Sequence, residues 1–93
     1  MSNIIGMTAM QRGRYTLEML HDSLMYDEQP DARWAGRAFE TFEEDRANVK
    51  DQERLSELLA VIDDVQAHIA EHPKGTTVLF LVRYAMTLAR GLA

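Results

Sequence analysis

The sequence predicts an all-α protein, a small antiparallel bundle of three to four helices formed by a single domain over residues 1–93. Three observations predict this class. Alanine, leucine, glutamate and arginine, which are strong helix formers, dominate the chain. No segment alternates apolar and polar residues as a half-buried strand would. Apolar residues recur instead at spacings of three and four, and only two prolines and five glycines interrupt them.

The first helix is expected over residues 8–25, because its apolar residues follow one another at spacings of three and four and so share one face. This stripe contains Met10, Gly13, Leu17, Leu20 and Leu24. Gly13 costs about 1 kcal/mol of helix stability relative to alanine, and on a core stripe it either permits close packing or simply weakens the start of the helix. The polar residues 27–30 then form a turn.

The second helix is expected over residues 31–49. Pro30 suits its first turn, because the N–H that proline lacks is not needed there. Its inner face contains Ala35, Ala38, Phe39, Phe42 and Val49. Trp34 lies one turn before Ala38, where it either packs over the end of the bundle or anchors a partner.

The third helix is expected over residues 52–72 and has the most regular pattern in the chain. Spacings of three, four, three and four connect Leu55, Leu58, Ile62, Val65 and Ile69, as in the seam of a bundle. Pro73 ends this helix, because the residue before a proline is pushed out of the α region.

The boundary between the second and third helices depends on the phase of the two stripes. The stripe set by Ala35 and Phe42 would continue to Ser56, whereas the third helix has its apolar residue at Leu55. This slip of one residue, together with the capping potential of Asp51, favours a break near residues 48–51. One long helix with a stutter is the alternative.

The last helix is expected over residues 76–92, with Thr76 as its N-cap. Its sequence, TTVLFLVRYAMTLARGLA, leaves almost no polar face, and a helix that is apolar nearly all round must be covered on several sides. We therefore expect this helix to be central in the bundle or to lie at the seam of a homodimer. Arg83 and Arg90 form its one polar stripe, and they interrupt the roughly 20 apolar residues that a membrane span needs.

The charges of the chain are unevenly distributed. The net charge is −5; residues 27–71 carry thirteen acids against five bases, a net charge of −8, and residues 72–93 carry three bases and no acid. Such an acidic middle repels phosphates, so we expect no direct binding of nucleic acid. The chain has no cysteine and no basic leader before an apolar stretch, which fits a cytoplasmic protein that binds no membrane.

No motif predicts an enzyme or a cofactor. The chain has no Gly-x-Ser-x-Gly elbow and no glycine-rich phosphate loop. His68 and His72 are four residues apart and Glu18 precedes His21 by three, spacings that metal sites in helical bundles use. We expect these to be surface side chains and predict no metal, and a metal-binding bundle in which the four side chains converge is an alternative.

The function that we expect is a small protein–protein interaction regulator: an inhibitor, anti-activator or adaptor that binds a larger protein through an apolar helix surface. Bacterial anti-activators, secretion co-chaperones and phage inhibitors have this size and character, although no motif links the chain to them. The expected partner-binding residues are Leu79, Phe80, Arg83, Tyr84, Leu88 and Trp34, and a homodimer is expected. The alternative is a phage-type acidic inhibitor that mimics nucleic acid with Glu40, Glu43, Glu44 and Asp51, against which the interleaved arginines argue.

Overall fold

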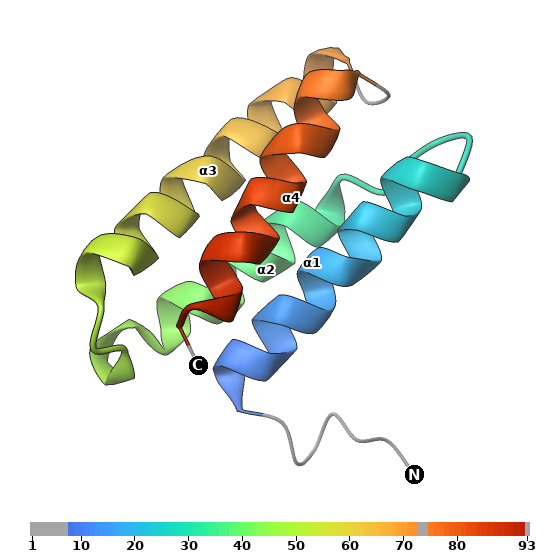
Figure 1. The fold of residues 1–93 in the computed structure, drawn as a ribbon. Helices are drawn as coiled ribbons and strands as arrows, with labels where there is room; N and C mark the ends of the chain where they lie inside the picture. Colours follow the sequence, from blue (N-terminus) through green and yellow to red (C-terminus); the bar gives the residue numbers. More distant parts are fainter. Residues whose placement is uncertain (1–7, 73–74, 93) are drawn as a thin grey trace, which may run out of the picture.

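Four helices form the structure, a computed structural model that describes residues 8–72 and 75–92 (Figure 1). In chain order they are α1 (Ala9–Tyr26), α2 (Arg33–Glu44), α3 (Gln52–Glu71) and α4 (Thr76–Arg90), and the short 3₁₀ helix η2 (Arg46–Asn48) follows α2. Successive helices run in opposite directions, and the described residues contain no strand. The predicted all-α antiparallel bundle is thus confirmed.

Each helix packs against two others. α1 contacts α2 and α4, and α3 contacts the same two helices. In Figure 1, α4 lies in front between α1 and α3, and α2 lies behind. The last helix is therefore flanked by two neighbours rather than surrounded, which corrects the expected central position and leaves the outer face of α4 open. The alternative position, at a dimer seam, stays a prediction.

The inner faces of the four helices form one apolar core. The predicted stripe of α3 is buried throughout, and Leu24 and Phe39, expected inside, are only partly buried. The side chains with less than 2% exposure and the largest volumes are Phe42, Leu17, Leu20, Leu55, Leu58, Ile62, Val65, Val78 and Val82. Every helix supplies at least one of them, so the core depends on all four helices.

Gly13 permits the closest contact between α1 and α2. A Cβ atom built on Gly13 would lie 2.5 Å from Cζ of Phe42, and also 2.6 Å and 2.8 Å from the two neighbouring ring carbons. Phe42 is 0% exposed, so its ring has no open space into which to retreat. The close packing predicted for this glycine is confirmed.

The break between the second and third helices is also confirmed. α2 ends at Glu44 rather than at residue 49, and the chain then makes the 3₁₀ turn and an extended residue, Val49, which is buried against the core. The carboxylate of Asp51 accepts a hydrogen bond from the backbone N–H of Arg54 at 3.0 Å and so caps α3. The alternative of a single long helix is wrong.

The start of α2 and the cap of α4 differ from the prediction, and the other helix ends lie within two residues of it, apart from the end of α2. α2 begins at Arg33, so Pro30 lies before the helix, and the carboxylate of Asp31 accepts the backbone N–H of Arg33 at 2.9 Å. Thr76 is the first residue of α4 rather than its N-cap, which is Gly75 and provides no side-chain hydrogen bond. Pro73 lies outside the described residues. Within residues 8–72 and 75–92, no helix has both the length and the apolar character needed to cross a membrane.

Candidate protein-interaction surface

The outer face of α4 exposes two large aromatic side chains. The exposed residues of α4 are Thr76, Thr77, Phe80, Arg83, Tyr84, Thr87 and Arg90, and we call them the α4 face. Phe80 is 64% exposed and Tyr84 is 44% exposed, whereas the opposite side of the helix is buried in the core. The face contains two arginines and no acid, in a chain whose net charge is −5.

The edge of the α4 face towards α3 is fixed by a hydrogen bond. The phenolic O–H of Tyr84 donates to Oε1 of Glu57 on α3. This hydrogen bond raises the pKa of Tyr84 above its usual value of about 10, and partial burial and the negative charge of Glu57 raise it further. The neutral phenol is thus the form that the folded protein favours.

The Tyr84 hydrogen bond predicts a pH dependence at the alkaline end. Because the pKa of Tyr84 is raised on folding, its contribution to stability is complete below about pH 10 and is lost as the pH rises through the folded-state pKa. In an ultraviolet titration of tyrosinate, the ionisation of Tyr84 should be a late step, above about pH 10. Tyr84→Phe should remove that late step, and Glu57→Gln should move it back towards about pH 10. A titration unchanged by Glu57→Gln would contradict the assignment.

The edge of the α4 face towards α1 is polar and basic. Nε of Arg83 donates to Nε2 of His21 at 3.4 Å, and the other ring nitrogen of His21 lies 3.5 Å from a carboxylate oxygen of Asp22. The ring of His21 thus lies between the guanidinium of Arg83 and the carboxylate of Asp22. This contact joins α1 to the exposed side of α4.

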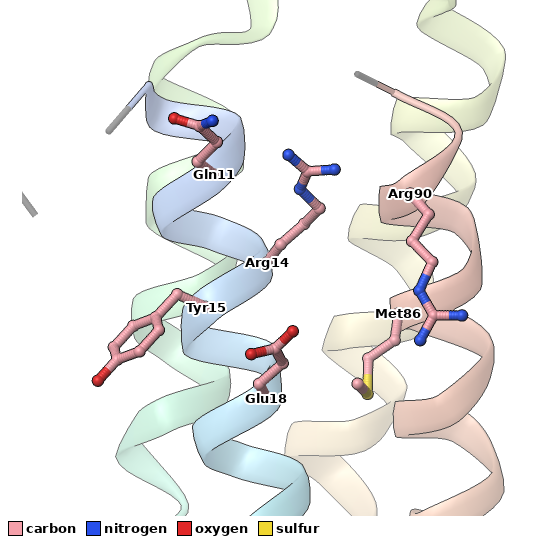
Figure 2. Close-up of a pocket in the computed structure, with 6 residues that line it drawn as sticks. All are labelled: Gln11, Arg14, Tyr15, Glu18, Met86 and Arg90. Atoms are coloured by element: carbon pink, nitrogen blue, oxygen red, sulfur yellow. The ribbon is translucent and has the colours of Figure 1, made fainter. Parts of the chain in front are cut away.

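A shallow groove of about 420 Å³ continues this edge towards the other end of the two helices (Figure 2). It is lined by Gln11, Arg14, Tyr15, Glu18, Met86 and Arg90. Arg14 extends from α1 towards α4, and Met86 and Arg90 lie opposite on α4. Neither arginine has a hydrogen bond or an ion pair within the part of the chain that the structure describes. Two cations without such a partner thus border the groove.

The six predicted partner-binding residues divide into three groups. Phe80, Arg83 and Tyr84 are exposed and lie together on the α4 face. Leu79 is partly buried, and Leu88, at 5% exposure, belongs to the core, which corrects its assignment to the surface. The sequence could not show this, because Leu88 and Phe80 are both apolar and only the positions of the neighbouring helices separate them.

Trp34 lies apart from the α4 face. It is on α2, behind α4 in Figure 1, where it is partly buried against the core. The guanidinium carbon of Arg37 lies 5.1 Å from the centre of its ring, within the range of a cation–π interaction. Trp34 also lines a groove with Tyr15 of α1. The structure therefore separates Trp34 from the other exposed candidates.

Sequence reasoning missed the acidic line on α3 that borders the α4 face. Glu53, Glu57, Asp64 and Glu71 are exposed and follow one another at spacings of four, seven and seven, which places them on one line of the helix. Ala60 and Ala67 lie between them on the same line and are also exposed. Because Glu57 contacts Tyr84, the acidic line runs beside the α4 face. The regular spacing was the signal that could have identified it.

The four candidate metal ligands do not converge. Glu18 and His21 are on α1, whereas His68 is on α3 and His72 directly follows it, and these two helices are separated by α2 and α4. His68 instead donates from Nδ1 to the backbone carbonyl of Asp64 at 2.8 Å. Among the described residues, no group of three or more histidine or acidic side chains is placed to hold a metal ion.

Comparison with known protein families, curated proteins and solved structures gives no match for this chain. The α4 face and the two charged edges beside it are therefore the features of this protein that point to a function.

Proposed function

We propose that this protein is a small protein–protein interaction regulator that binds another protein through the α4 face. One observation carries the proposal: Phe80 is 64% exposed beside Tyr84 on a face that has arginines but no acid. Clustered exposed apolar side chains are typical of interaction sites, and tyrosine and arginine are enriched among the residues that dominate binding energies. An aromatic side chain buries about 150–250 Å² when it is covered.

The shape of the α4 face favours a helical partner. Thr76, Phe80, Arg83, Thr87 and Arg90 follow one another at spacings of four, three, four and three. Such a line matches the seam against which an amphipathic helix packs. A partner helix would cover Phe80 and Tyr84 with apolar side chains and place acids near the arginines. α4 is held by α1, by α3 and by hydrogen bonds from Arg54 to its last turn, so little ordering is needed on binding.

The test is photo-crosslinking at one position on the face and one off it. We expect p-benzoylphenylalanine in place of Phe80 to form adducts with another protein in cells that naturally make this chain. The same group in place of Tyr26, which is 78% exposed at the end of α1, is the matched control and should form no such adduct. Adding Arg83→Glu should abolish the adduct. Equal labelling from both positions, or none from either, would refute binding through the α4 face.

A mimic of nucleic acid is the second candidate function, because the acidic line on α3 presents carboxylates at regular spacing. Seven residues of helix advance about 10.5 Å, so the line extends along most of α3. By contrast, Glu43 of the acidic run on α2 is paired with Arg46 at 3.3 Å. A crosslinker in place of Ala60 should then capture DNA-binding proteins, and an excess of DNA should suppress these adducts. Adducts that DNA leaves unchanged would eliminate this candidate.

A further inference from the structure

We infer that the α4 face binds a second copy of this chain, in a symmetric dimer whose two-fold axis runs parallel to α4. The inference rests on the proposed function in that both need the α4 face to bind a protein, and it names a second copy as the occupant of that face in the free protein, which another protein would displace. It depends on the order of three parallel bands across the side of the molecule formed by α1, α4 and α3, which faces the viewer in Figure 1.

The basic band lies on the α1 side. It consists of Arg14, Arg83 and Arg90. Arg83 reaches His21 of α1, and the other two arginines border the groove between α1 and α4 (Figure 2). Glu18 is the one acid that lines this groove.

The aromatic band, Phe80 and Tyr84, lies on the middle of α4. The acidic band lies on the α3 side and is the line described above, Glu53, Glu57, Asp64 and Glu71. The hydrogen bond from Tyr84 to Glu57 fixes the order, because it places the aromatic band next to the acidic one. From α1 to α3 the surface thus passes from a band in which three arginines outnumber the acids Glu18 and Asp22, through the aromatic band, to an acidic band.

This order makes the surface complementary to itself under one symmetry operation. In a two-fold dimer the same patch is used by both copies. An axis parallel to α4 exchanges the two sides of the surface, so the basic band of each copy faces the acidic band of the other. An axis perpendicular to α4 within the interface would place arginines on arginines and carboxylates on carboxylates, which is unfavourable. The charges therefore select the first arrangement, in which the two α4 helices run parallel.

The apolar residues fit the same arrangement. The aromatic band lies between the charged bands, so it falls near the axis, where Phe80 and Tyr84 of one copy meet those of the other. Aromatic side chains in such a position pack edge-to-face or offset. Ala60 and Ala67 interrupt the acidic line with small, exposed side chains, which leave room for the long arginine side chains of the second copy.

The test exchanges charges between the two outer bands. One variant carries Arg83→Glu and Arg90→Glu, and the other carries Glu53→Arg and Asp64→Arg; all four positions are exposed, so both variants should fold, as circular dichroism can verify. We expect the wild type to be a dimer by analytical ultracentrifugation. Each variant alone should be a monomer or at least tenfold weaker as a dimer, because its two outer bands then have the same sign of charge. An equimolar mixture of the two variants should recover the dimer.

Three results would overturn the inference: a monomeric wild type at high protein concentration, a dimer that neither variant weakens, or a mixture that fails to associate although both variants fold. The crosslinking experiment separates these failures from that of the proposed function. If the protein is a monomer and p-benzoylphenylalanine in place of Phe80 still forms adducts with another protein, the dimer is refuted and the proposed regulator function is supported. A charge-dependent dimer that forms no such adduct supports the dimer and refutes the regulator.

Discussion

Gly13→Ala should lower the free energy of unfolding by about 1 kcal/mol, although alanine is the better helix former. The added methyl group would lie 2.5 Å from Cζ of Phe42, whose ring is completely buried. Either the ring or α1 must move, and overpacking a core costs about 1–3 kcal/mol, more than the roughly 1 kcal/mol gained in helix propensity. Urea denaturation followed by circular dichroism measures the change.

Gly36→Ala is the matched control, because it makes the same substitution in α2. There the new Cβ would meet only Nε2 of Gln66, at 3.3 Å, the end of a flexible side chain on α3. We expect this variant to be unchanged or up to about 1 kcal/mol more stable. Phe42→Leu should relieve part of the Gly13→Ala penalty in the double variant, since residues in contact couple. Equal effects at both glycines would show that the contact with Phe42 does not limit packing.

Arg54→Ala should lower the free energy of unfolding by about 1–2 kcal/mol, because one side chain joins the start of α3 to the end of α4. Nε of Arg54 donates to the carbonyl of Leu88 at 2.8 Å, and Nη2 donates to that of Thr87 at 3.1 Å. The last carbonyls of a helix have no partner within the helix and carry partial negative charge. A guanidinium donates hydrogen bonds to these carbonyls and also balances their charge. The same denaturation measurement gives the change.

Two variants isolate the geometry of this contact. Arg54→Lys keeps the charge but lacks the planar fork that reaches two carbonyls, so it should recover only part of the loss. Arg46→Ala removes an arginine from an exposed pair with Glu43 and should change stability by less than about 0.5 kcal/mol. Hydrogen exchange in the last turn of α4 should accelerate in Arg54→Ala alone. A stability loss of equal size in Arg46→Ala would contradict a specific role for Arg54.

The fold was predictable where the sequence contains a periodic stripe. Leu55, Leu58, Ile62, Val65 and Ile69 are all buried, as their spacing indicated. The slip in phase between the second and third helices located their break correctly, because two stripes in different phase cannot face one core on a single straight helix.

Helix ends were less predictable. Pro30 was expected in the first turn of α2, which begins three residues later, and Thr76 was expected as the N-cap of α4, which is instead Gly75. Several residues near a helix end can satisfy its unpaired backbone groups, so local preference does not select one of them.

The sequence by itself determined that the chain forms helices and which face of α3 is buried, because periodicity is a local property that the residues of one helix carry. Only the tertiary structure decided which side of α4 is covered. When a helix is apolar nearly all round, its sequence does not indicate which face is buried. The positions of α1 and α3 decided this for α4, because they placed Leu88 in the core and left Phe80 exposed. The same packing brought Glu57 of the acidic line of α3 against Tyr84 of α4, a juxtaposition of residues that lie far apart in the sequence.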